Sequence, residues 1–223
     1  VVGATVHGLA VDGSDDRDEM GVYVAPPEYV CGLSKPEPHI WRTQPEGARS
    51  GPGDTDLTIY ELRHWMKLAV SGNPSVLLLL FVPDVTLVKR TREGDRLRAM
   101  APAILSRQAG HRFLGYLHAQ RERMEGQGKQ NRVPNRPELV ERHGYDVKYA
   151  AHALRLGLQG IELVTTGRIT LPMPETDRAM VLDVRHGRAD RRQAVEMIDA
   201  VALRLENAMA DDQQALPERP DVD

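Results

Sequence analysis

The sequence predicts an α/β protein of the α+β kind, in which a small mixed sheet precedes a mostly helical C-terminal half. Three observations support this class. Strand-like apolar residues alternate with glycine-containing turns over residues 1–24. Apolar residues spaced three or four apart, as on one face of a helix, begin at Leu57. Residues 95–210 consist of long periodic segments with short polar breaks, which is typical of successive helices.

The opening residues predict a strand, a turn with a short helix over Thr5–Ala10, and a second strand that leads into Val22. We expect the first strand to begin before Val1. Asp16 and Asp18 are two residues apart, so on a strand both would point to one face. Two carboxylates held that close repel each other unless a cation lies between them. Oxygen ligands on a rigid strand suit Mg²⁺ together with substrate phosphates, so the opening predicts a metal–nucleotide site.

The middle of the chain predicts a loop followed by a helix. Residues 25–55 are rich in proline, glycine and polar side chains, which indicates a long connection with an exposed flap. The apolar spacing predicts a helix over 57–71, ended by Gly72-Asn73-Pro74. The apolar run 76–82 suits a buried strand or helix.

The second half predicts a series of helices around one basic loop. Residues 125–137 are polar and basic and are expected to form a loop. A short strand-like piece follows the Gly167 stop, over Ile169–Pro172, and the last dozen residues form a polar tail. The expected helices span Leu97–Leu105, His111–Met124, Asp146–Thr165, Asp177–Val184 and Asp190–Met209.

Composition excludes several classes of protein. Hydrophobic residues make up 41% of the 223 residues and charged residues 27%, which is ordinary for a globular domain. The single cysteine, Cys31, excludes an internal disulfide framework and a cysteine-based zinc site. The net charge of −3 argues against a globally basic nucleic-acid binder but permits a local basic groove. We see no signal peptide and no apolar run of membrane-spanning length, and expect a cytoplasmic protein.

A second group of candidate residues lies on the longest predicted helix. Lys148, His152 and Arg155 are spaced i, i+4 and i+7, so one helix face presents all three. Three basic groups in a line suit a triphosphate, whose charge must be neutralised in a transfer reaction. The alternative is an ordinary solvated face that pairs with acids.

These motifs together resemble the nucleotidyltransferases of the DNA polymerase beta superfamily, and within it the RNA repair pathway DNA polymerase beta family. The resemblance covers roughly residues 1–187. It rests on Gly3-Ala4, His7-Gly8, Asp15-Asp16-Arg17-Asp18-Glu19-Met20-Gly21-Val22, Gly72-Asn73-Pro74, the Lys148, His152 and Arg155 series, and Thr166-Gly167.

The resemblance implies transfer of an NMP from an NTP to an acceptor hydroxyl, with release of pyrophosphate and dependence on Mg²⁺ or Mn²⁺. The implied metal ligands are Asp16, Asp18 and Asp56, with Asp54 as the competitor for the third place. Asp56 also suits a helix N-cap. The implied nucleotide-binding residues are Gly3, Ala4, Thr5, His7, Lys148, His152 and Arg155. Residues 1–94 would form the catalytic core, 95–210 a helical region that completes the nucleotide site, and 211–223 the tail.

The acceptor implied by the resemblance is an RNA end, tRNA included, with a protein or a small molecule as the alternative. If it is RNA, we expect contacts from Lys129, Arg132 and Arg136, helped by Arg121 and Arg123. A third reading, a nucleotide-binding protein without activity, stays open because of two departures from the family pattern, although the intact Asp16 and Asp18 pair argues against it. Ala4 replaces the usual serine, and Leu78 the usual glutamate.

Overall fold

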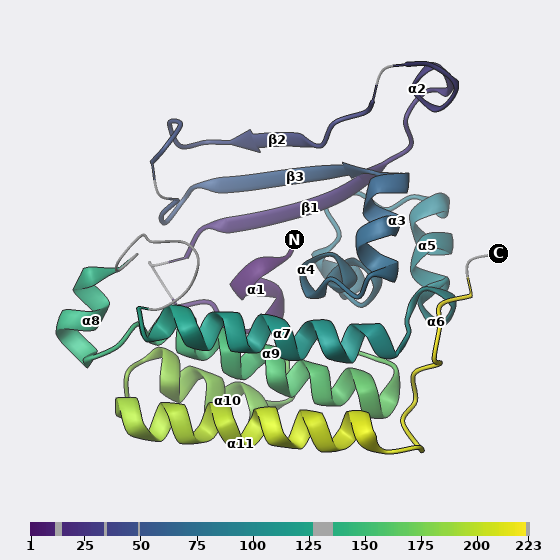
Figure 1. The fold of residues 1–223 in the computed structure, drawn as a ribbon. Helices are drawn as coiled ribbons and strands as arrows, with labels where there is room; N and C mark the ends of the chain where they lie inside the picture. The colour runs from purple at the N-terminus through teal and green to yellow at the C-terminus, as the bar shows by residue number, and fades with distance from the viewer. Residues whose placement is uncertain (12–14, 34, 49, 127–135, 222–223) are drawn as a thin grey trace.

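The computed structural model describes residues 1–11, 15–33, 35–48, 50–126 and 136–221, and it confirms the α+β class (Figure 1). Its three-stranded mixed sheet has the order β1-β3-β2. β1 (Arg17–Tyr23) runs parallel to the central strand β3 (Thr55–Glu61), and β2 (His39–Arg42) pairs with β3 in the antiparallel direction. The sheet forms one layer and the long C-terminal helices form the other, with α1 between them (Figure 1).

Among the described residues, two short helices precede or interrupt the strands, and the other helices all follow β3. The short ones before residue 105 are α1 (Gly3–His7), α2 (Pro27–Cys31), α3 (Leu62–Val70), α4 (Pro74–Leu77), η1 (Leu78–Leu80), η2 (Asp84–Thr86), α5 (Arg92–Ala99) and α6 (Ala101–Ile104). The later ones are α7 (Arg107–Met124), α8 (Pro137–His143), α9 (Val147–Thr166), α10 (Glu175–Arg185) and α11 (Arg191–Ala210). None of the helices in the described ranges is both long and apolar enough to cross a bilayer.

The predicted helix over 57–71 is wrong in its first part, because residues 57–61 belong to β3. A second, two-residue alternation runs through this segment, with Leu57 and Ile59 on one face and Thr58 and Tyr60 on the other. Pairing with β1 selects that alternation over the helical one. The helix starts only after Glu61, whose carboxylate accepts a hydrogen bond from the His64 N–H. Asp56 is therefore a strand residue and not a helix N-cap.

Smaller differences concern the ends of elements. The first helix covers Gly3–His7 rather than residues 5–10, because Gly8 ends it in a left-handed conformation with φ 71°. Val1 and Val2 form no strand, although the Val2 N–H donates to the Asp18 carbonyl at 2.8 Å. Ile169–Pro172 is likewise not a strand. β2 and α8 were not predicted, since each is short and lies in a polar, proline-bearing segment.

Most of the helical half agrees with the prediction, but the expected helix over Leu97–Leu105 is wrong, because α5 ends at Ala99 and α6 is a separate turn over Ala101–Ile104. α7, α9, α10 and α11 lie within a few residues of their predicted bounds, and Gly167 ends α9 with φ 69°. Residues 76–82 form α4, η1 and the residues after them, which are mostly buried. α9 is the central helix and packs against α7, α10 and α11. Its N-terminal half carries Lys148, His152 and Arg155, which line the same cavity as residues of β1 and β3.

Candidate functional site

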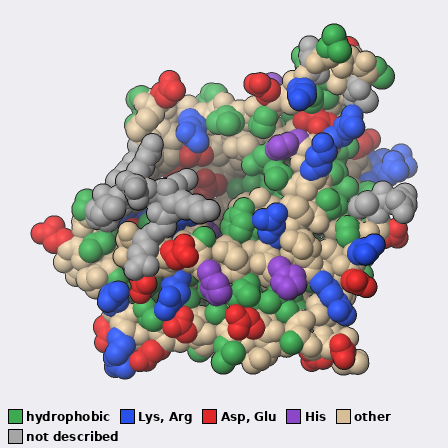
Figure 2. Space-filling model, viewed as in Figure 1, with side chains coloured by type: hydrophobic (Ala, Val, Ile, Leu, Met, Phe, Trp, Pro, Cys, Tyr) green, Lys and Arg blue, Asp and Glu red, His purple; other side chains and the backbone are tan. Residues whose placement is uncertain are grey.

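A cavity of about 510 Å³ lies between the sheet and the helices. Figure 2 shows it as a hollow below the sheet, with acidic side chains inside. Its walls come from α1, β1 and β3 on one side and from α9 and the end of α10 on the other. The predicted site residues that line it are Gly3, Ala4, His7, Asp16, Asp18, Asp56, Lys148, His152 and Arg155. Thr5 is not among the lining residues, and its side chain is exposed.

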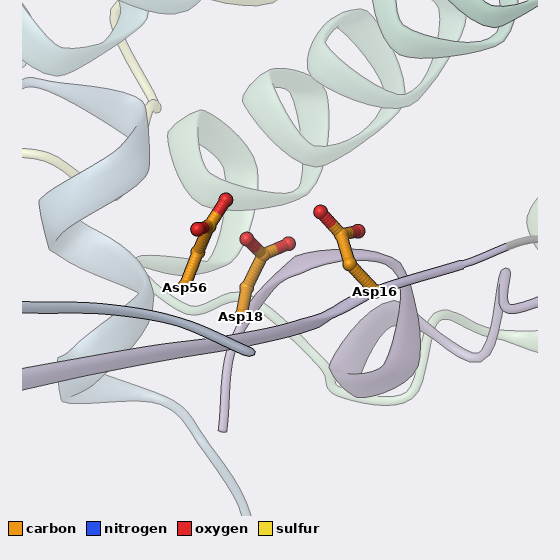
Figure 3. Close-up of side chains that lie close together, drawn as sticks. All are labelled: Asp16, Asp18 and Asp56. Carbon is orange, nitrogen blue, oxygen red and sulfur yellow. The ribbon is translucent and has the colours of Figure 1, made fainter. Parts of the chain in front are cut away.

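Three carboxylates meet on the sheet side of the cavity (Figure 3). Asp18 of β1 is the register partner of Asp56 on β3, and Asp16 lies two residues before Asp18 at the start of the strand. One oxygen from each of the three lies within 4.8 Å of the others. Asp54 stays outside this cluster, since its carboxylate accepts hydrogen bonds from the Thr43 hydroxyl and the Gly51 N–H.

The cluster is electrostatically strained in the absence of a cation. Burial raises the pKa of Asp18 to about 6, and the neighbouring charges of Asp16 and Asp56 contribute to the rise, against the lowering effect of Lys148. An ionised Asp18 thus needs positive charge that the side chains alone do not supply. Carboxylate oxygens at this spacing are what Mg²⁺ and Mn²⁺ prefer in proteins, so the three residues fit a divalent cation.

Asp56 is held ionised by its own neighbours. Burial acts to raise its pKa, but hydrogen bonds from Ser50 (2.6 Å) and Gln44 (2.8 Å) and the charge of Arg42 outweigh this and lower the pKa. The Arg42 Nε lies 3.5 Å from an Asp56 oxygen. These three partners lie in residues 25–55, the segment predicted as an exposed flap. Nothing in its sequence indicated that it would contact a carboxylate on a strand.

The raised pKa of Asp18 leads to a prediction about metal binding. A carboxylate must lose its proton to bind a metal ion, so the Mn²⁺ affinity levels off about one pH unit above the pKa of Asp18 and falls as the pH drops through it. We expect Mn²⁺ affinity, measured by calorimetry on the nucleotide-free protein, to fall about tenfold from pH 7 to pH 5. Asp56, with its lowered pKa, adds nothing in this range. Equal affinity at pH 5 and pH 7 would contradict the assignment of Asp18 as a ligand.

Gly3 lets α1 approach the carboxylates. Its backbone has φ +71°, and a Cβ atom built on it would lie 2.0 Å from the Asp18 Oδ2 atom. Any other residue would therefore push Asp18 away and would also adopt a left-handed conformation that L side chains rarely take. Gly3, which the sequence predicts to be a nucleotide-binding residue, is thus also needed for α1 to lie this close to the Asp18 carboxylate.

The cations of the cavity surround a fourth carboxylate, Asp15. Its side chain is 6% exposed and accepts a hydrogen bond from Arg185 Nη2 at 2.5 Å, while Lys148 Nζ lies 3.7 Å away. The Val11 N–H also donates to it. Lys148 is placed at the first turn of α9, where the buried Asp146 carboxylate caps the helix by accepting from the Lys148 and Tyr149 N–H groups.

A buried polar network holds Arg155 at the back of the cavity. Arg155 Nη1 donates to His7 Nε2 (3.0 Å) and to Gln159 Oε1 (2.9 Å), and Gln159 Nε2 lies 3.1 Å from His7 Nδ1. Burial, Arg155 and His152 lower the pKa of His7 well below its usual range, so His7 is neutral. Burial and then Arg185 lower the pKa of Arg155 to about 10, which leaves it charged at neutral pH.

His152 contributes no charge to the series predicted on α9. Its side chain is exposed to the cavity, which it lines together with Arg155. Desolvation inside the cavity lowers its pKa well below the usual range, and the charge of Arg155 lowers it further. The cationic groups that α9 and α10 contribute to the cavity are therefore Lys148, Arg155 and Arg185, and Arg42 and Arg136 line it as well.

The basic loop predicted to contact RNA is only partly described. Lys129 and Arg132 lie outside the described residues. Arg136 lies at the cavity, 3.4 Å from the Asp146 carboxylate and 5.2 Å from the centre of the Tyr149 ring. Arg121 forms an ion pair with Asp199 at 2.8 Å.

Comparison with known proteins gives one result. A family model described as RNA repair pathway DNA polymerase beta family matches residues 1–218. Neither the curated proteins nor the solved structures give a match. The matched range includes both the strands that carry the carboxylates and the helices that carry the cations, so all of the cavity lies within it.

Proposed function

The chain belongs to the RNA repair pathway DNA polymerase beta family, and on this basis we propose that it is a metal-dependent nucleotidyltransferase. It would move an NMP from an NTP to an acceptor hydroxyl, with an RNA end such as that of tRNA as the acceptor, and release pyrophosphate. The observation that carries the proposal is the meeting of Asp16, Asp18 and Asp56 in a cavity whose opposite wall is cationic.

The three carboxylates are proposed to hold Mg²⁺ or Mn²⁺. A bound divalent cation neutralises phosphate charge and lowers the pKa of an attacking hydroxyl. Asp56 is kept ionised by its hydrogen bonds and Arg42, and Asp18 by the cation once it is bound. The two ligands thus differ because of their surroundings: Asp56 is ionised well below neutral pH, and metal-free Asp18 is mostly ionised only above about pH 6.

The cations opposite are proposed to bind the triphosphate. Lys148 and Arg185 lie near the cavity wall that faces the carboxylates, and Arg155 is held in place by His7 and Gln159. Arginine and lysine suit phosphate because each donates several charge-assisted hydrogen bonds. His152, being neutral, would act as a hydrogen-bonding group. Residues 1–94 would then form the catalytic core, and residues 95–210 would complete the nucleotide site.

Asp15 is expected to compete with the NTP for the cations of the cavity. It occupies Lys148 and Arg185, the groups proposed to bind phosphate. Asp15→Asn keeps the shape and an acceptor for the Val11 N–H but removes the charge. We expect NTP to bind about fivefold more tightly in titration calorimetry, which corresponds to about 1 kcal/mol of released ion pairing. Asp183→Asn on the exposed part of α10, which breaks the pair with Arg188, is the matched control. Weaker NTP binding by Asp15→Asn would mean that Asp15 positions the cations instead.

The experiment that tests the proposed function follows the label of an NTP. Each NTP, labelled at the α-phosphate, is incubated with the protein and Mg²⁺ or Mn²⁺ in the presence of an RNA pool that includes tRNA. We expect metal-dependent label on RNA. Label on the protein itself, or on an added small hydroxyl compound, would support the alternative acceptors. NTP binding with no transfer to any acceptor would indicate an inactive nucleotide-binding protein.

A further inference from the structure

Two long stretches of the chain contain no carboxylate at all. The chain has 32 Asp and Glu residues, yet none occurs in residues 62–83 or in residues 96–121. Both stretches carry arginine and histidine, and the first also carries lysine. Although the net charge of the chain is −3, these two stretches are therefore purely cationic, and the carboxylates are confined to the rest of the sequence.

The fold brings these two stretches together. The turn directly after α3 packs on α7, where Arg112 Nε donates to the Ser71 carbonyl at 3.2 Å and Asn73 Nδ2 donates to the Tyr116 hydroxyl at 3.2 Å. Gly72, with φ +77°, permits this contact, since a Cβ on it would lie 2.5 Å from the Ala109 Cα. The last turn of α3, which carries Lys67, thus lies close to the part of α7 that carries Arg112.

We call the resulting face the α3–α7 surface and define it by the exposed residues Arg63, His64, Lys67, His111, Arg112 and His118. Figure 2 shows basic and histidine side chains over α3 and α7, next to the hollow of the cavity. Among the described residues, no carboxylate lies within 4.0 Å of the charged groups of Arg63, Lys67 or Arg112. Their charges are available to a partner.

An aromatic pair connects this surface to the cavity. Tyr60 lines the cavity, and its ring stacks on that of His64 with centroids 5.9 Å apart and planes 12° from parallel. His64 is exposed on the α3–α7 surface. Ser75, also exposed, lines the cavity close to the same helix. A stacked ring pair beside unpaired cations is the combination that binds an unpaired base and its phosphates.

We propose that the α3–α7 surface binds the phosphate backbone of a single-stranded RNA acceptor, whose end enters the cavity past Tyr60 and His64. The proposal rests on the proposed function and specifies where its acceptor lies. The α3–α7 surface is not the RNA-binding region expected from the sequence. Of the residues expected there, Arg121 is paired with Asp199, and Arg136 lies beside Asp146 and Tyr149. The ring pair favours a single strand over a duplex, in which the bases are stacked on one another.

The test measures RNA binding against salt concentration. The probe is a labelled single-stranded oligoribonucleotide of about 12 nucleotides, within the range that a strand-tracking groove covers. Arg63→Ala/Lys67→Ala/Arg112→Ala is compared with Arg168→Ala/Arg188→Ala/Arg204→Ala, which removes the same charge from exposed positions outside the two stretches. Each lost phosphate contact reduces the slope of log affinity against log salt by about 0.7. We therefore expect the slope of the first variant to fall by about 2, and that of the control to stay unchanged.

The double variant Arg63→Ala/Lys67→Ala guards against loss of folding, because it keeps the Arg112–Ser71 hydrogen bond and should lower the slope by about 1.4. NTP binding should be unchanged in all variants. The proposal would be overturned if RNA binding by the wild type depended steeply on salt and neither variant changed that slope. It would also be overturned if the control variant lowered the slope by the same amount. Displacement of the RNA by polyglutamate at equal charge would overturn it too, since this would indicate an acidic polypeptide partner. Failure of the proposed function looks different: RNA binding would persist without NTP binding or label transfer.

Discussion

Asparagine in place of Asp18 is expected to abolish nucleotidyl transfer while leaving a folded protein. The loss should exceed the roughly 10- to 100-fold effect of removing a group that only orients a metal ligand. The physical reason is that Asp18 is a partly buried charge and lies in one cluster with the carboxylates of Asp16 and Asp56. Turnover of an α-labelled NTP, together with the thermal midpoint of unfolding, measures both parts of the prediction.

The stability of this variant should not fall, because the substitution removes a charge that the metal-free fold disfavours. The raised pKa of Asp18 means that its ionised form costs stability above about pH 6, and that this cost disappears as the pH falls below the unfolded value of 3.8. Asp18→Asn should therefore unfold at a higher temperature than the metal-free wild type at pH 8, and at the same temperature at low pH.

The matched control is Asp54→Asn, which alters a nearby carboxylate outside the cluster. The side-chain amide of this variant retains one oxygen as an acceptor for the Thr43 hydroxyl or the Gly51 N–H. We expect near wild-type turnover and a stability loss of at most about 1 kcal/mol. Wild-type turnover by Asp18→Asn, or an equal loss in Asp54→Asn, would contradict the assignment of the metal ligands.

Alanine in place of Gly3 is expected to cost at least about 100-fold in turnover. The added Cβ would lie 2.0 Å from Asp18 Oδ2, so the carboxylate or α1 must move by about an ångström or more. A displacement of about 1 Å near reacting groups can reduce a rate by about 10²-fold. The affinity for Mn²⁺ should fall together with the turnover, and titration of Mn²⁺ into the Gly3→Ala variant would measure this loss.

Gly53→Ala separates the steric clash from backbone strain. Gly53 has φ +88°, and a Cβ there would meet no atom within 4 Å. Both variants place alanine in the left-handed region, at about 1–2 kcal/mol each, but only Gly3→Ala presses on a carboxylate. If Gly53→Ala lost as much turnover as Gly3→Ala, backbone strain and not the approach of α1 to Asp18 would explain the result.

Local patterns explain which parts of the site were predictable. Asp16 and Asp18 were identified from a two-residue repeat, and Lys148, His152 and Arg155 from a helical one, since each pattern lies within a single element. The structure brings all five to one cavity. Their predicted roles as ligands and phosphate-binding groups stay predictions until they are measured.

The site features that the sequence did not predict depend on contacts between elements that are distant along the chain. Asp56 was placed at a helix start because the helical and strand alternations overlap over 57–61, and only pairing with β1 decides between them. Ser50 and Gln44 beside Asp56, and Gln159 beside His7, gave no signal, because a single polar residue reveals no partner. The neutrality of His152 likewise depends on desolvation inside the cavity and on the charge of Arg155.

The most direct test of the central claim compares two labels on one NTP. The wild-type protein is incubated with RNA, Mg²⁺ or Mn²⁺, and an NTP labelled at either the α- or the γ-phosphate. Nucleotidyl transfer predicts that the α-label becomes covalently attached to the acceptor and that the γ-label leaves as pyrophosphate, with neither event in Asp18→Asn. Transfer of the γ-label to the acceptor, or α-label transfer that Asp18→Asn retains, would contradict the claim that these carboxylates serve nucleotidyl transfer.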